Sequence, residues 1–228
     1  MFSNQKRKSM LDTTSLSDKI ESHLKQEILS GDLMPGQRLT IDDIAERLQV
    51  SAMPVRDAVR RLDDLGFLKV APRRGVFVED FDQTRFRHTM EVRIALESLA
   101  VELAAPRIPE EQILAAREAY VRGGQHFIET GDLSRLVECD NLLHELIVSH
   151  SQNPLLISIM GQLQDLIGWA HHIVARLQPQ GKFDALPEHL EILDVLLERD
   201  VAKTQIVLRK HLQNTLQRTL RAWDQSPE

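Results

Sequence analysis

The chain has 228 residues, of which 42% are hydrophobic and only 4% aromatic, with a formal net charge of −6 at pH 7. Leu, Ile, Val and Ala recur at helical spacing along most of it, which favours a mainly α protein of two domains over a β-sandwich. A single cysteine, Cys139, excludes an intrachain disulfide and fits a cytoplasmic location. The longest apolar stretch, residues 94–105, contains two glutamates, so no membrane segment is expected.

The negative charge is distributed unevenly. Basic and acidic side chains balance over the first eighty residues, whereas acidic side chains predominate in residues 81–228. Within residues 51–78, lysine and arginine outnumber aspartate. Because nucleic acids respond to local charge more than to the net charge, this distribution is compatible with an N-terminal DNA-binding domain on an acidic body.

The N-terminal part shows two helical patterns after a polar segment of residues 1–14, which is expected to be a disordered tail. Apolar side chains recur every fourth residue from Leu16 to Ile28 and stop at Gly31. A second, short helix is expected to begin after Thr40, whose spacing to the following acidic residue is that of a capping box.

A third helix is expected to begin with Ser51 as its cap, and Pro54 lies in its first turn, where a missing N–H costs nothing. Two β-prone runs follow, residues 67–70 and 75–78, joined by a turn that carries two arginines. This order of elements predicts a winged helix-turn-helix over residues 15–80.

In a helix-turn-helix the second helix of the pair enters the major groove of double-stranded DNA with its N-terminal end. Side chains opposite the buried face of this helix are expected to reach bases and phosphates, and the wing arginines the adjacent groove or backbone. The predicted DNA-binding residues are Thr40, Ser51, Ala52, Met53, Arg56, Arg60, Arg73 and Arg74. The alternative is a structural subdomain whose arginines pair with Asp57, Asp63 and Asp64.

This stretch resembles the winged-helix domain of the GntR family of regulators. The segments that carry the resemblance are LMPGQRL from Leu33, IAERLQVSAMPVRDAVRRL from Ile44, GFL from Gly66 and PRRGVFV from Pro72. Many members place Arg-Thr after the capping serine, where this chain has Ala52 and Met53. The resemblance therefore implies that Arg56 is the strongest candidate for reading bases.

Residues 81–228 are helical in pattern almost throughout, and about six helices are expected to form an all-α bundle. The pattern breaks near residues 106–109, 131, 153–154, 179–181 and 199–200.

Four residues of this part form a candidate metal site. Asp140 and His144 are four residues apart on one expected helix, which places both side chains on one face. His189 and His211 are equidistant from Asp200, so in an antiparallel hairpin centred there they would face each other. Such a set suits Zn²⁺, Ni²⁺ or Mn²⁺ and leaves positions open for water or a ligand carboxylate. The alternative is that each is a surface or packing residue.

Residues 85–220 resemble the all-helical FCD effector domain of the FadR-type subfamily. The matching motifs are EVRIALE from Glu91, Asp-x-x-x-His from Asp140, Asn-Pro from Asn153, Glu-His-x-x-Ile-Leu from Glu188 and His-Leu from His211. The resemblance implies that the four residues above bind a divalent metal and that Arg93 faces an effector pocket. An ion pair of Arg93 with Glu97 on a solvated face is the alternative, although apolar neighbours favour the pocket.

The expected function is that of a homodimeric transcription regulator, more specifically a repressor. It would bind an inverted repeat in DNA and respond to a small organic acid bound near the metal. One alternative makes the metal itself the signal. Another is a metal-dependent hydrolase or lyase, against which stands the lack of a glutamate at a recognisable spacing to the ligands.

Overall fold

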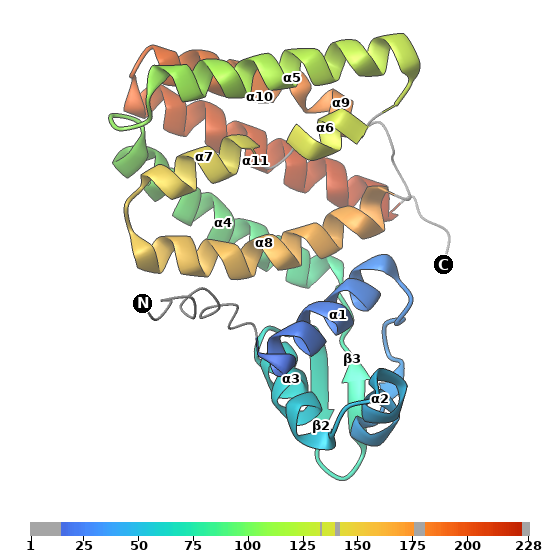
Figure 1. Cartoon of the computed structure of the whole chain (residues 1–228). Helices are drawn as coiled ribbons and strands as arrows, with labels where there is room; N and C mark the ends of the chain where they lie inside the picture. The colour runs from blue at the N-terminus through green and yellow to red at the C-terminus, as the bar shows by residue number, and fades with distance from the viewer. Residues whose placement is uncertain (1–14, 133, 140–141, 176–180, 225–228) are drawn as a thin grey trace, which may run out of the picture. The chain divides into compact units, whose positions relative to one another are not determined.

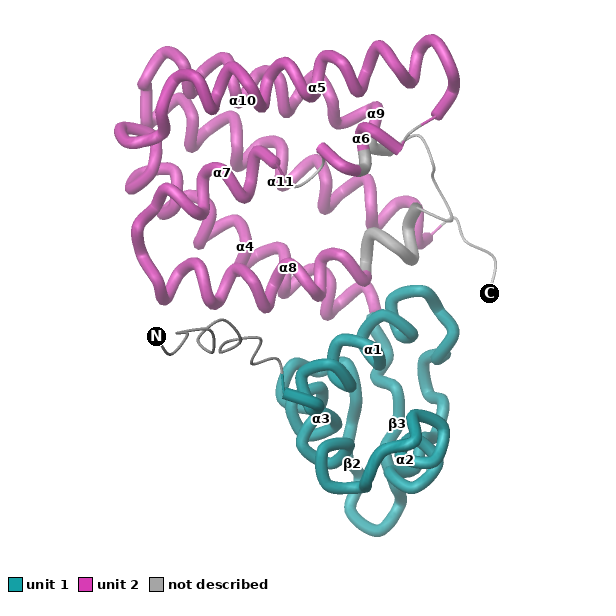
Figure 2. The backbone as a smooth tube through the Cα atoms, in the orientation of Figure 1, with its two compact units in different colours: residues 1–81 teal, residues 82–228 magenta. Residues whose placement is uncertain are grey.

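The computed structural model describes residues 15–132, 134–139, 142–175 and 181–224. The chain divides into two compact units, residues 1–81 (unit 1) and residues 82–228 (unit 2), coloured separately in Figure 2. The expected tail, residues 1–14, lies outside the described residues.

Unit 1 begins with three helices, α1 (Leu16–Ser30), α2 (Ile41–Leu48) and α3 (Ala52–Asp64) (Figure 1). Ser15 starts α1 with a capping box, and Gly31 ends it with a φ of 84°. The Thr40 hydroxyl caps α2 by accepting a backbone N–H at 3.1 Å. Ser51 lies at the N-cap of α3, as expected, but within the described residues its hydroxyl makes no capping hydrogen bond. The reason is that Pro54 stands at the N3 position and supplies no N–H.

Unit 1 also has three short strands. Strand β1 (Arg38–Leu39) lies between α1 and α2, whereas β2 (Leu68–Ala71) and β3 (Gly75–Val78) follow α3. They form an antiparallel sheet in the order β1-β3-β2, with Leu39 opposite Val76 and Leu68 opposite Val78. The predicted hairpin is β2 and β3. Strand β1 was not predicted, because two residues are too few to show an alternating pattern.

The core of unit 1 lies where α1 and α3 meet the sheet. Leu24, Leu62, Phe67 and Leu68 are each at most 1% exposed there. Arg61 of α3 also forms ion pairs with Asp18 and Glu21 of α1. The packing fixes α3 by one face and leaves its opposite face to solvent.

Unit 2 is all-helical in its described part. Its helices are α4 (Gln83–Ala104), α5 (Glu110–Thr130), α6 (Ser134–Cys139), α7 (Leu142–His150), α8 (Pro154–Ala175), α9 (Gly181–Asp184), α10 (Leu186–Leu197) and α11 (Val201–Asp224). The six expected helices correspond to the longer ones. Helices α6 and α9, of six and four residues, were not predicted, since such short helices show no complete period.

Helix α4 is central in unit 2 and contacts α7, α8 and α11, whereas α5 packs against α6 and α10 (Figure 1). The C-terminal end of α4 is held by Arg199, whose Nη1 donates to the carbonyl oxygens of Ala105 and Ile108 at 2.8 and 2.7 Å. Helices α10 and α11 pack along each other on either side of this arginine. None of the described helices combines the length and apolar character needed to cross a membrane.

Candidate metal centre and DNA-binding surface

Three buried histidines from three helices converge in unit 2. His144 of α7, His189 of α10 and His211 of α11 are 5%, 3% and 3% exposed. Their candidate ligand atoms all lie within 4.8 Å of one another. The structure thus brings together three of the four residues in the predicted site, and the fourth, Asp140, lies outside the described residues.

The imidazole rings contact one another directly. The ring centroids of His189 and His211 are 4.4 Å apart, and those of His144 and His211 are 5.5 Å apart in a stacked arrangement. His189 also packs against the buried ring of Tyr120, with centroids 4.8 Å apart. Burial lowers the pKa of His211, although a hydrogen bond to Glu188 opposes the shift. A lowered pKa keeps this ring neutral, the form in which histidine binds metals.

Glu97 of α4 binds one of these histidines. Its Oε2 lies 2.6 Å from Nδ1 of His144, and its Oε1 accepts from Nε of Arg93 at 2.5 Å. Burial alone would raise the pKa of the Glu97 carboxyl, but the interactions of this carboxyl with Arg93 and His144 outweigh burial and hold the pKa far below its usual range.

Arg93 is 3% exposed, and Glu97 is fully buried. The ion pair named as the alternative for Arg93 is therefore present, but it is buried rather than on a solvated face. The charge of Arg93 also contributes to the lowered pKa of His211, in the same direction as burial, because the two groups are close.

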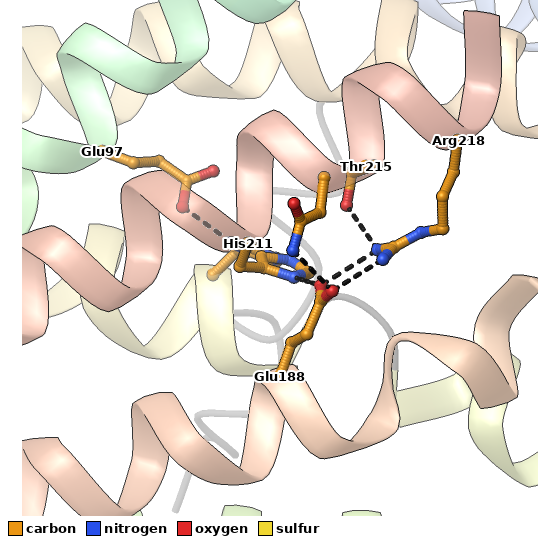
Figure 3. A network of polar contacts seen from close by, with 7 residues as sticks. Glu97, Glu188, His211, Thr215 and Arg218 are labelled. Carbon is orange, nitrogen blue, oxygen red and sulfur yellow. Dashed lines mark hydrogen bonds and ion pairs between the residues drawn. The ribbon is translucent and has the colours of Figure 1, made fainter. Parts of the chain in front are cut away.

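Glu188 of α10 binds another histidine and lies at the centre of a polar network (Figure 3). Its Oε2 is 2.8 Å from Nδ1 of His211, and it accepts two hydrogen bonds from Arg218, at 2.7 and 3.0 Å. Asn214 donates to Oε1 at 2.9 Å. Burial raises the pKa of the Glu188 carboxyl, but the hydrogen bonds from His211, Arg218 and Asn214 outweigh it and lower that pKa well below its usual range.

Neither glutamate was predicted to contact a histidine, since each does so on a different helix. Neither glutamate has a recognisable sequence spacing to the histidine that it contacts, and both reach the cluster only through the packing of the helices. One signal was available: Asn214 and Arg218 follow His211 by one and two turns, which places all three on one face of α11. Both carboxylates are held by arginines, so neither is placed as a free general base.

Helix α3 exposes the side predicted to face DNA. Met53 is 74% exposed, Arg56 and Arg60 are exposed, and Ala52 is half-buried. Across the described residues, the structure contains no ion pair between Arg56 or Arg60 and the aspartates of the same helix. Asp63 instead accepts a hydrogen bond from the backbone N–H of Val70 at 2.9 Å. The geometry leaves both arginines available to phosphates or bases.

The turn between β2 and β3 carries Arg73 and Arg74, which are both exposed. The turn is closed by a hydrogen bond from the Arg74 N–H to the Ala71 carbonyl at 3.0 Å. Arg73 has a φ of 64°, in the left-handed region that is unfavourable for a residue with a Cβ. An arginine at this position is therefore not explained by backbone preference.

Comparison with known proteins assigns each unit to a family. The family described as "Bacterial regulatory proteins, gntR family" matches residues 16–78, and the FCD domain matches residues 88–214. The HTH-type transcriptional regulator McbR of Escherichia coli is 29% identical over 207 residues, covering 90% of this chain and 91% of McbR. The HTH-type transcriptional repressor RspR of E. coli is 25% identical over 202 residues, covering 88% of this chain and 87% of RspR.

The solved structure of E. coli McbR/YncC is similar, with a TM-score of 0.73 and 25% sequence identity over 92% of this chain and 99% of that one. The chain therefore belongs to the gntR family of bacterial regulatory proteins and carries an FCD domain. It is a transcription regulator with a DNA-binding domain, as its motifs predict. The hydrolase or lyase alternative is wrong, because the matching families and relatives are regulators rather than enzymes.

Proposed function

We propose that this protein is a homodimeric repressor that binds an inverted repeat and is controlled by a small organic acid bound beside a divalent metal. The observation that carries the proposal is the buried cluster of three histidines in the FCD unit of a DNA-binding regulator. The name of the relative RspR, a transcriptional repressor, supports the direction of control.

The metal would be held by His144, His189 and His211, with Asp140 as a fourth ligand. Three imidazoles, buried and close together, are a donor set that suits Zn²⁺, Ni²⁺ or Mn²⁺. A bound metal of this kind would supply a Lewis-acid position for a carboxylate. Two of the histidines contact carboxylates through Nδ1, which is the usual environment of metal-binding histidines.

Arg93 would bind the effector carboxylate from a second side. Its guanidinium is buried close to His211, and arginine binds carboxylates through parallel hydrogen bonds. Its ion pair with Glu97 would fix the direction in which the guanidinium points.

DNA would be bound by α3 and the wing. Arg56 and Arg60 would contact bases or phosphates in the major groove, with Ala52 and Met53 against base edges and Arg73 and Arg74 on the adjacent backbone. Thr40 and Ser51 would approach phosphates through the N-termini of α2 and α3. Two copies related by a two-fold axis would read an inverted repeat.

Control would pass through α4 and α11. Helix α4 follows unit 1 directly in the chain and carries Arg93, whereas α11 carries His211. A ligand that binds two arrangements of these helices with different affinity would shift the balance between them, and with it the affinity for DNA.

The experiment uses the full chain, which is freed of metal by a chelator and then reloaded with Zn²⁺. The DNA is a fragment selected from a random pool. DNA affinity is measured by fluorescence anisotropy at fixed salt against a panel of mono- and dicarboxylates. At least one acid should change the affinity of the zinc-loaded protein, and His144→Ala with His189→Ala should abolish the response. His150→Ala, on the same helix α7, is the matched control and should respond normally.

No response to any acid would contradict the effector proposal. A change of affinity on adding Zn²⁺ alone, with none from acids, would instead make the metal the signal.

A further inference from the structure

We propose that Glu97 and Glu188 are positioning residues of the metal centre. Each fixes one histidine as the tautomer with its proton on Nδ1, so that the Nε2 lone pair faces the metal. The inference rests on the metal centre proposed above and adds two residues outside its ligand set.

Glu97 carries a negative charge inside unit 2. The carboxylate is fully buried, and its Oε1 accepts from Nε of Arg93, so it is ionised and can only accept hydrogen bonds. Its Oε2 is 2.6 Å from Nδ1 of His144. The proton of this hydrogen bond must therefore be on Nδ1, so that the neutral form of the ring carries its lone pair on Nε2.

Glu188 makes the corresponding contact with His211. Its oxygens accept from both terminal nitrogens of Arg218, a geometry that only an ionised carboxylate satisfies well. Its Oε2 is 2.8 Å from Nδ1 of His211. The same reasoning assigns the proton to Nδ1 of His211, and Figure 3 shows the carboxylate between this ring and the guanidinium.

The two contacts act on rings that lie side by side. His144 and His211 are stacked with centroids 5.5 Å apart, and each is bonded through Nδ1 to a carboxylate from another helix. Each ring is therefore fixed in rotation and in tautomer before any ion enters. Removing such an outer partner typically weakens metal binding about 10–100-fold.

A purely structural role is the alternative, in which each glutamate only joins helices through an arginine. Only the positioning role requires the proton of each ring to be on Nδ1. In the metal-free full chain labelled with ¹⁵N-histidine, long-range ¹H–¹⁵N spectra should show Nδ1–H rings for His144 and His211, assigned by single His→Gln variants. An Nε2–H ring at either position would overturn the proposal for its glutamate.

Glu188→Gln is the primary variant, since Glu97→Gln would leave the buried Arg93 without its counter-charge. Its Zn²⁺ affinity, measured by competition with a chelating dye, should fall about 10–100-fold while circular dichroism stays unchanged. Glu118→Gln is the control, because this exposed glutamate forms an ion pair with Arg122 away from the cluster. The control should bind Zn²⁺ like the wild type.

A double-mutant cycle separates positioning from general destabilisation. If Glu188 acts through His211, Glu188→Gln should cause no further loss of Zn²⁺ affinity in the His211→Ala background. An equal loss in both backgrounds would overturn the proposal. A wild-type chain that binds no Zn²⁺ would contradict the proposed function, and the tautomers of the metal-free protein would then decide the inference alone.

Discussion

The ring of Phe86, in the first turn of α4, packs against the ring of Trp223, in the last turn of α11, with centroids 5.7 Å apart. Beside them, Nε2 of Gln83 donates to Oδ1 of Asp224 at 2.9 Å. The start of the helix that follows unit 1 is thus joined to the end of the helix that carries His211. Under the proposed control through α4 and α11, a change at the histidine cluster would reach this point along either helix.

Phe86→Leu should therefore weaken the response of DNA binding to the effector. The loss of ring contact should cost about 1–2 kcal/mol of unfolding free energy, less than the roughly 3–5 kcal/mol of truncation to alanine. DNA affinity without the acid should be retained, and the ratio of affinities with and without it should fall severalfold. Phe127→Ala removes the ring contact with Phe183 elsewhere in unit 2 and is the control. Equal responses in the two variants would argue against a role for Phe86.

Arg56→Ala and Arg61→Ala should separate DNA contact from folding. Arg56 is exposed on α3, and its removal should largely abolish binding to the selected DNA while thermal unfolding is unchanged. Arg61 forms ion pairs with Asp18 and Glu21 of α1, so its removal should lower the unfolding temperature of unit 1 instead. Unchanged affinity of Arg56→Ala at fixed salt would contradict the assignment of α3 to the groove.

Arg73→Asn tests the wing. Asparagine tolerates the left-handed conformation at this position better than arginine, so the change should leave stability unchanged or raise it slightly. DNA affinity should fall. The plot of log affinity against log salt should become less steep by about 1, the change expected from the loss of one phosphate contact. Arg122→Asn, on α5, is a control of equal charge change. A variant that kept both its affinity and its salt slope would exclude the wing from the interface.

Arg199→Met tests how α4 is held at its C-terminal end. The variant loses two hydrogen bonds from a charged donor to the carbonyls of Ala105 and Ile108, and should lose about 1–2 kcal/mol of unfolding free energy in urea. Lys203→Met, which removes an exposed ion pair with Glu198 near the same turn, should leave the urea midpoint almost unchanged. Equal midpoints in both variants would show that these hydrogen bonds contribute nothing.

The elements of unit 1 were predictable because local signals mark them: apolar spacing, caps and the turn at the wing. Strand β1 was not predicted, because its two residues form a strand only by pairing with β3. Ser51 occupies the expected N-cap of α3, but its hydroxyl makes no capping hydrogen bond, because Pro54 lacks the N–H that would donate it.

The candidate metal site was predictable to the extent that its histidines have symmetrical or one-turn spacings. Glu97 and Glu188 were missed because their contacts join helices far apart in sequence, which no periodicity records. The burial of the Arg93–Glu97 pair was missed for the same reason. The spacing of four residues predicts the ion pair, but only the packing of α7, α8 and α11 around α4 decides that water is excluded from it.

Elemental analysis of the full chain purified without chelator shows whether the histidine cluster holds a metal. We expect about one divalent metal per chain, and only a small fraction of that in the His144→Ala, His189→Ala double variant. A wild-type chain with no more bound metal than the double variant would contradict this expectation.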